Sequence, residues 1–263
     1  MTAPDPRAVL SRAAAAPDAV LRYGPAADHL IDVHLPGSRR PAPLVVLMHG
    51  GFWRAAFDRR HTRPLASALR DEGYVVVTPE FRRTGGGGGW PATFDDVAAV
   101  RDRLPDLLVQ VLPERVDADE PVLVGHSAGG HLALWWSLTG GGESVVALAP
   151  VADLKRAYVD DLGGGAVAAL MGGSPTDVAG RYAAADPAVL LRARAIDATV
   201  VHGTDDAQVP VSHSRALTGV ELVELPGVEH FALIDPLSTA WPHVLAAIRR
   251  SGEAHRHRLT SQV

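Results

Sequence analysis

The stretch VLVGHSAGGHLALWW, residues 122–136, constrains the fold more than any other part of the chain. An apolar run typical of a buried strand leads into Gly-His-Ser-Ala-Gly, and a second apolar run suited to a helix follows. A G-x-S-x-G pattern between a strand and a helix predicts a sharp elbow at the carboxyl end of the strand, where the glycines permit the turn. Ser127 is therefore the candidate nucleophile.

Further β-rich runs alternate with helix-like segments. The predicted strands cover 29–36, 43–51, 74–81, 121–127, 144–150, 198–206 and 220–225, and the predicted helices cover 61–72, 94–110, 129–138 and 237–250. Most of these strands are continuously apolar, as parallel strands covered by helices on both faces are. We expect the first two to pair antiparallel because they lie close together. The pattern predicts a single α/β domain over 1–263 with a mostly parallel central sheet flanked by helices.

The connection at 153–196 is too long for a simple crossover. It contains two glycine clusters and short helical patterns, which predict small helices joined by loops. An insertion of this kind either caps a site or is a decorative excursion, and the sequence leaves both interpretations open.

Composition excludes several functions. The net charge of −5 and the absence of cysteine argue against nucleic-acid or polybasic membrane partners and against thiolate chemistry. Asp5 and Pro6 interrupt the N-terminal region before any secretory signal forms, and no apolar run approaches the ~18 residues that span a bilayer, so we expect a cytoplasmic protein. His255 and His257 lack a third ligand at useful spacing, and we expect neither metal nor cofactor. The sequence leaves open whether the protein forms a homodimer.

A serine hydroxyl needs a base, and the base needs an orienting acid. Asp205 and Asp206 end the predicted strand at 198–206, and His230 follows the strand at 220–225. The order serine, aspartate, histidine is that of α/β-hydrolases. The segment HGTDDAQVP resembles the acid loop of prolyl-oligopeptidase and esterase members of that fold, and the resemblance selects Asp206 as the acid and leaves Asp205 as a loop carboxylate.

Attack on a carbonyl also requires N–H donors for the oxyanion. The segment MHGGFW follows the strand at 43–51 where lipases and esterases carry their oxyanion loop. We expect Gly51 or Phe52 to supply one donor and Ala128 the second. Trp53 in this segment and Trp90 in TGGGGGW are also expected near the mouth of the site. There they would stack on an aromatic substrate or serve in ordinary packing.

Four other histidines flank these motifs and are interpreted as packed, supporting imidazoles: His49, His126, His131 and His202. The HGGxW form at 49–53, together with GHSAGGHLA and HFALIDP, resembles the arylformamidases that hydrolyse N-formylkynurenine and their bacterial esterase relatives. The segment FRRTGGGGGWPATFDD also resembles hormone-sensitive-lipase-like esterases. The resemblance spans about 28–250 and implies a triad of Ser127, Asp206 and His230.

These features predict a cofactor-free serine hydrolase that cleaves small ester or amide substrates through an acyl-enzyme, with an aryl formamide as the best single substrate. A general carboxylesterase would use the same groups. A small-peptide or prolyl peptidase is less favoured because no acidic pair for a free amine is evident. A non-catalytic binding protein with this fold would not need a complete triad beside an oxyanion loop.

Overall fold

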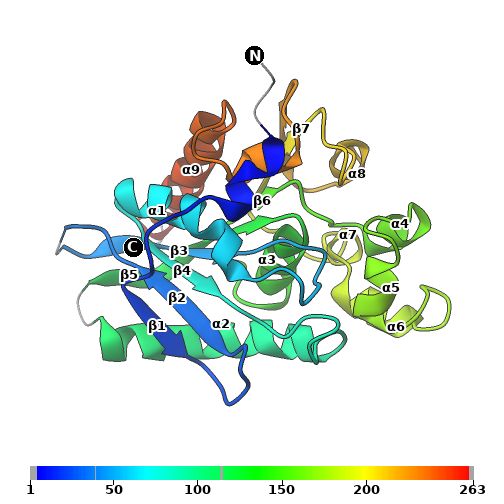
Figure 1. The fold of residues 1–263 in the computed structure, drawn as a ribbon, viewed down its shortest axis with the longest axis horizontal. Helices are drawn as coiled ribbons and strands as arrows, with labels where there is room; N and C mark the ends of the chain where they lie inside the picture. The colour runs from blue at the N-terminus through cyan, green and yellow to red at the C-terminus, as the bar shows by residue number, and fades with distance from the viewer. Residues whose placement is uncertain (1–4, 39, 113–114, 261–263) are drawn as a thin grey trace.

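One eight-stranded sheet organises the protein, whose computed structural model describes residues 5–38, 40–112 and 115–260 (Figure 1). The strands are β1 (Ala19–Arg22), β2 (Leu30–His34), β3 (Ala42–Met48), β4 (Val75–Pro79), β5 (Val116–His126), β6 (Val145–Leu148), β7 (Ala198–Gly203) and β8 (Glu221–Leu225), in the spatial order β1-β2-β4-β3-β5-β6-β7-β8. All pairs from β4 to β8 are parallel, while β2 pairs antiparallel with β1 and β4. The predicted mostly parallel sheet is confirmed.

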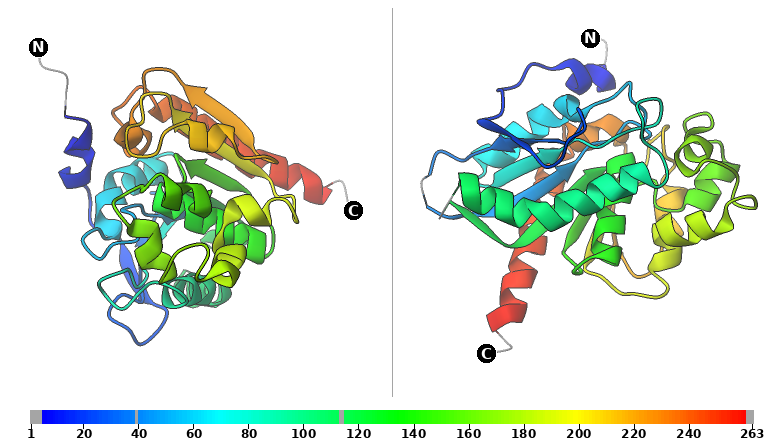
Figure 2. Two further views of the ribbon diagram at one scale, coloured as in Figure 1. Left: turned by 90° about the vertical axis from the view of Figure 1, so that its right-hand side faces the viewer. Right: turned by 90° about the horizontal axis from the view of Figure 1, so that it is seen from below.

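Helices cover both faces of this sheet (Figures 1 and 2). The α-helices are α1 (Arg63–Asp71), α2 (Ala92–Val111), α3 (Ala128–Thr139), α4 (Leu154–Val159), α5 (Ala166–Met171), α6 (Ala179–Ala185), α7 (Pro187–Leu190), α8 (Ser212–Arg215) and α9 (Trp241–Thr260), and the 3₁₀ helices are η1 (Pro6–Ser11), η2 (Arg59–Thr62) and η3 (His230–Ile234). Side chains of α2 and α3 share one apolar core with the sheet, and those of α1 and α9 share the other. The strands are apolar on both sides because both faces are covered.

The predicted antiparallel pairing of 29–36 with 43–51 is wrong. Strand β2 lies between β1 and β4, whereas β3 pairs with β4 and β5 in the middle of the sheet. Strand β3 is buried along nearly its whole length, so a central position with parallel neighbours satisfies it better than an edge hairpin. The short β1, half exposed, was not predicted.

Residues 153–196 form the small helices α4 to α7 joined by loops, as the sequence predicted, and are called the α4–α7 segment below. This segment connects β6 to β7 and lies beside the end of the sheet, at the right in Figure 1. Its four helices are short, and the loops between them contain the left-handed glycines Gly163, Gly164, Gly165, Gly172 and Gly173. Whether the segment covers the site depends on the side chains that surround Ser127.

Candidate active site

Ser127 lies at a tight elbow between β5 and α3. Its backbone has φ 56° and ψ −118°, a left-handed conformation that is strained for a residue with a side chain. A Cβ on Gly125 would lie 2.2 Å from the carbonyl oxygen of Gly129, and one on Gly129 would lie 2.1 Å from that of Met48. The sequence interpretation, in which glycine freedom makes the turn, is therefore corrected: Ser127 itself adopts the positive φ, and the glycines provide space for the helix to cross the strands.

The elbow is tied to the neighbouring strand. The Ser127 amide donates to the carbonyl of Leu148 at 2.8 Å, and the Ser127 carbonyl accepts from the amides of Val151 and His131 at 3.2 and 3.1 Å. Because β6 and α3 both hold this one residue, its strained conformation is fixed before a substrate arrives.

His230 and Asp206 form a short hydrogen bond beside this elbow. His230 begins η3, and its Nδ1 lies 2.6 Å from Oδ2 of Asp206. Asp206 cannot donate when ionised, so Nδ1 carries the proton and Nε2 is left as the basic nitrogen. Oδ1 of Asp206 accepts from the amides of Gln208 and Val209, both at 2.8 Å.

The charge state of Asp206 follows from these contacts. Burial opposes its ionisation, but hydrogen bonds from His202 and His230 outweigh that effect and lower the pKa of Asp206. Asp205, by contrast, is exposed and accepts a hydrogen bond from the Thr204 hydroxyl at 3.0 Å. The structure thus brings Asp206 to the imidazole and leaves Asp205 in the loop position that the sequence gave it.

A cavity of about 140 Å³ opens at the serine. It is lined by Arg7, Leu10, Gly51, Phe52, Phe57, His61, His126, Ser127, Gln208, His230 and Phe231. Most of this wall is apolar, and Ser127 and His230 lie on it together. The candidate nucleophile and base therefore face the same space.

The predicted oxyanion loop reaches this cavity. Gly51 and Phe52 have φ values of 111° and 50° and line the wall beside Ser127. A Cβ on Gly51 would lie 2.5 Å from Cβ of Phe57, so only glycine fits there. Ala128 is the first residue of α3, where the helix itself provides no acceptor for the backbone N–H. The three predicted donor residues thus surround the serine.

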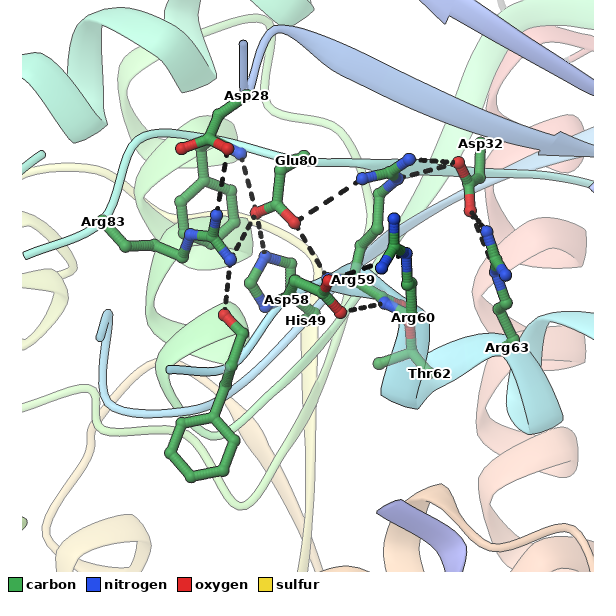
Figure 3. Close-up of polar contacts among 12 residues, drawn as sticks. Asp28, Asp32, His49, Asp58, Arg59, Arg60, Thr62, Arg63, Glu80 and Arg83 are labelled. Atoms are coloured by element: carbon green, nitrogen blue, oxygen red, sulfur yellow. Dashed lines mark hydrogen bonds and ion pairs between the residues drawn. The ribbon is translucent and has the colours of Figure 1, made fainter. Parts of the chain in front are cut away.

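A buried ionic cluster lies behind the oxyanion loop (Figure 3). Glu80 is 2.8 Å from Nε2 of His49, accepts from the Arg59 amide at 3.0 Å and forms an ion pair with Arg83 at 3.3 Å. Burial opposes ionisation of Glu80, but the charges and hydrogen bonds around it, those of His49 first, lower its pKa to about 2. Arg83 also donates to the carbonyl of Phe57 at 2.5 Å. The cluster therefore holds His49 within the loop and Phe57 beyond its end.

The flanking histidines are buried and hydrogen-bonded, as predicted. Nε2 of His126 donates to the carbonyl of His230 at 3.1 Å, and Nε2 of His131 donates to that of Ala185 at 2.9 Å. Burial, and for His126 the neighbouring charge of His230, lowers the pKa of His126, and burial lowers the pKa of His131 to about 4. Nδ1 of His202 lies 2.6 Å from the Ser214 hydroxyl, and its Nε2 lies 3.3 Å from Oδ2 of Asp206.

The two predicted substrate-binding tryptophans are not on the wall of this cavity. Trp53 is only 1% exposed and packs edge-on against His131, with ring centroids 5.2 Å apart. Trp90 packs against Phe94 with centroids 5.1 Å apart, and its amide donates to the carbonyl of Leu170. Both indoles therefore take the packing role, and their predicted place at the mouth of the site is corrected.

Sequence reasoning missed several residues of the wall, namely Arg7, Leu10, Phe57, His61, Gln208 and Phe231. Arg7 and Leu10 belong to η1, which carries no motif and lies far from the other site residues in the chain. Gln208 lies inside HGTDDAQVP, and Phe231 follows the candidate base within HFALIDP, so proximity to these motifs is the signal that could have found them.

The described residues contain neither a metal-binding cluster nor a membrane-spanning helix. Across 5–38, 40–112 and 115–260, no group of three or more histidine, cysteine, aspartate or glutamate side chains is arranged to hold a metal ion. No helix in the described part of the chain is both long and apolar enough to cross a bilayer.

Fold and site together define an α/β-hydrolase. The family model BD-FAE matches residues 31–220, and the chain belongs to that family. A similar solved structure is esterase B from Lactobacillus rhamnosis, with a TM-score of 0.80 and 18% identity over 98% of this chain and 92% of that one. Esterase 2 of Thermogutta terrifontis, solved with butyrate bound, has a TM-score of 0.64 and 19% identity over 89% of this chain and 92% of that one. These likenesses show the fold.

Two relatives are similar in sequence. Esterase LipQ of Mycobacterium tuberculosis is 29% identical over 250 residues, which cover 79% of this chain and 55% of LipQ. Kynurenine formamidase of Danio rerio is 32% identical over 112 residues, which cover 42% of this chain and 35% of that protein. The chain thus spans about half the length, or less, of these relatives.

Proposed function

We propose that this protein is a serine hydrolase that cleaves small esters or amides through an acyl-enzyme. The observation that carries the proposal is that Ser127, at a strained elbow, and His230, bonded to Asp206, line one cavity. Relatives named as esterases support ester hydrolysis as the primary activity.

The chemistry divides among these residues. Nε2 of His230 takes the proton of the Ser127 hydroxyl while Oγ attacks the substrate carbonyl carbon, and the oxyanion is met by backbone N–H groups of the Gly51–Phe52 loop and of Ala128. The imidazolium then protonates the leaving alcohol or amine. Water, deprotonated by the same nitrogen, releases the acid and restores the serine.

The ionised Asp206 stabilises the imidazolium in both steps. Its second oxygen is held by two backbone amides, so the carboxylate cannot rotate away from His230 without losing those bonds. A cavity of about 140 Å³ with an apolar wall suits a compact substrate with an apolar body.

An aryl formamide is the second candidate substrate. Three phenylalanines, Phe52, Phe57 and Phe231, contribute to the cavity wall and can contact an aromatic ring. The partial similarity to kynurenine formamidase favours the same class of substrate.

The test compares kcat/KM for p-nitrophenyl esters of increasing chain length with that for N-formylkynurenine. We expect measurable turnover of the short esters and a loss of about 10⁶-fold in kcat in Ser127→Ala, because the nucleophile is removed while the fold persists. A fluorophosphonate should label the native protein at Ser127 and leave that variant unlabelled. Labelling at another serine would refute the proposal, and a preference for N-formylkynurenine by orders of magnitude would favour the formamidase.

A further inference from the structure

The N-terminal helix η1 lies against the loop that carries the candidate base. In Figure 1 η1, in dark blue, lies beside the orange segment that holds η3. Val9 is fully buried in the core shared with Leu233 and Ile234. The Arg12 guanidinium binds both carboxylate oxygens of Asp235, one of them at 2.8 Å. These two contacts hold η1 against the segment 233–235, which follows the candidate base.

One side of η1 faces the cavity. Residues three apart in a 3₁₀ helix lie on the same side, and Arg7 and Leu10 both line the wall that holds Ser127. The Arg7 guanidinium carbon lies 5.8 Å from the centroid of the Phe231 ring. The face of the Phe231 ring thus stabilises the Arg7 guanidinium beside the cavity through a cation–π contact.

Arg7 forms no ion pair with the carboxylates that the structure describes, whereas the acids on the same and neighbouring elements are engaged. Asp5 accepts from the Arg7 backbone amide at 2.9 Å, and Glu229 accepts from the amides of Phe231 and Ala232. Asp235 is held by Arg12. The guanidinium of Arg7 therefore keeps its hydrogen-bond donors for another anion.

We propose that Arg7 is a carboxylate subsite of the catalytic cavity. The substrate class is an ester or amide whose apolar body packs against Leu10 and the phenylalanines and whose carboxylate lies at the end remote from the scissile bond. Arg7 is an exposed residue that also lines the cavity, and a planar guanidinium binds a carboxylate through two parallel hydrogen bonds. The inference rests on the proposed hydrolase activity, since it concerns the substrate of the same site.

The experiment uses two matched substrate pairs. Mono-p-nitrophenyl glutarate against p-nitrophenyl pentanoate places the carboxylate on the acyl group, and p-acetoxybenzoate against its methyl ester places it on the leaving group. We expect Arg7→Gln to lower kcat/KM for the anionic member of one pair by about tenfold or more, the size expected for a lost charged hydrogen bond. Neutral members should change less than about twofold, and Arg7→Lys should retain part of the preference.

A matched control removes an equal charge elsewhere. Arg250 lies on α9 with a 54% exposed side chain, and its ion pair with Glu221 is as long as 3.9 Å. Arg250→Gln should leave both ratios unchanged, because it alters net charge without touching the cavity. If Arg7→Gln changes neither ratio, or slows anionic and neutral substrates equally, the carboxylate subsite is refuted while turnover of the neutral esters upholds the hydrolase. If native protein turns over none of the esters, the hydrolase proposal itself fails.

Discussion

The N-terminal helix η1 and the α4–α7 segment both lie beside the predicted oxyanion loop, but they contact it in different ways. Helix η1 contributes Arg7 and Leu10 to the cavity wall. The α4–α7 segment touches the loop from outside that wall: Arg54 donates to the carbonyl of Gly164 at 2.8 Å, and a Cβ on Gly163 would lie 2.7 Å from the Phe52 ring. One segment borders the cavity, and the other contacts a residue of the cavity wall, Phe52, from outside.

The difference shows that a long insertion between strands need not become the wall of a site. Sequence left two roles open for 153–196, a cap or a decoration, yet the described wall of the cavity includes none of its residues. We therefore expect changes in η1 to alter the ranking of substrates, whereas changes in the α4–α7 segment should affect all substrates together.

Neither segment contains the proposed catalytic residues Ser127, Asp206 and His230. Asp206→Asn should lower kcat by about 10⁴-fold for every substrate, because it removes the charge that stabilises the imidazolium and can impose the wrong tautomer. Asp205→Asn, its exposed neighbour, is the matched control and should remain close to native. Steady-state kinetics on a short and a bulky ester checks both variants. A larger loss in Asp205→Asn would contradict the assignment of the acid.

The α4–α7 segment contains a buried carboxyl that should make the stability of the protein depend on pH. Burial, helped by the charge of Asp153, raises the pKa of Asp186 in the α4–α7 segment from 3.8 to about 6. A raised folded-state pKa means that the stabilisation is present below the unfolded pKa and is lost as the pH rises through 6. This group should remove about 2 kcal/mol of unfolding free energy between pH 4 and pH 7.

Asp186→Asn should abolish that share of the pH dependence, because asparagine does not titrate. Urea unfolding of both proteins from pH 4 to pH 7 measures the difference in slope. Parallel curves for the native protein and the variant would show that folding does not raise the pKa of Asp186.

The smallest effects distinguish the segments most directly. Leu10→Ala should change the ratio of kcat/KM for bulky and short esters severalfold, because the shorter side chain enlarges the cavity. Gly163→Ala should lower kcat/KM for both esters by a similar, severalfold factor, because a left-handed glycine at φ 69° gains a Cβ against Phe52. Gly180 has no atom within 4 Å of such a Cβ, so Gly180→Ala should behave as native. A changed ester ratio in Gly163→Ala would place the α4–α7 segment in the selection of substrate.

Much of the candidate site was predictable because its motifs end parallel strands. Ser127 follows β5, Asp206 follows β7 and His230 follows β8, and the carboxyl ends of parallel strands meet at one edge of the sheet. The structure places Asp206 within hydrogen-bond distance of His230, although they lie 24 positions apart. Here local pattern and topology point to the same arrangement.

The predicted pairing of β2 and the predicted position of Trp53 were wrong, because contacts between segments distant in the chain determine both. Strand β2 is next to β3 in the chain but lies across β4 from it, because β4 returns to fill the place between them. Trp53 follows the glycines of the predicted oxyanion loop, but its indole is buried against His131 of α3 and does not line the cavity. Neither result can be predicted from spacing along the chain, because hydrophobic periodicity and local motifs do not determine which part of the fold a side chain contacts.

The sequence by itself determined the α/β class, the elbow at Ser127 and the chain order of serine, acid and histidine, because these depend on local pattern and on the rule that parallel strands end together. Only the tertiary structure decided which side chains surround the serine. Arg7 reaches the cavity because Val9 is buried in the core and Arg12 binds Asp235, a residue 223 positions away. Contacts of that kind depend on the packing of the whole chain, and no local propensity specifies them.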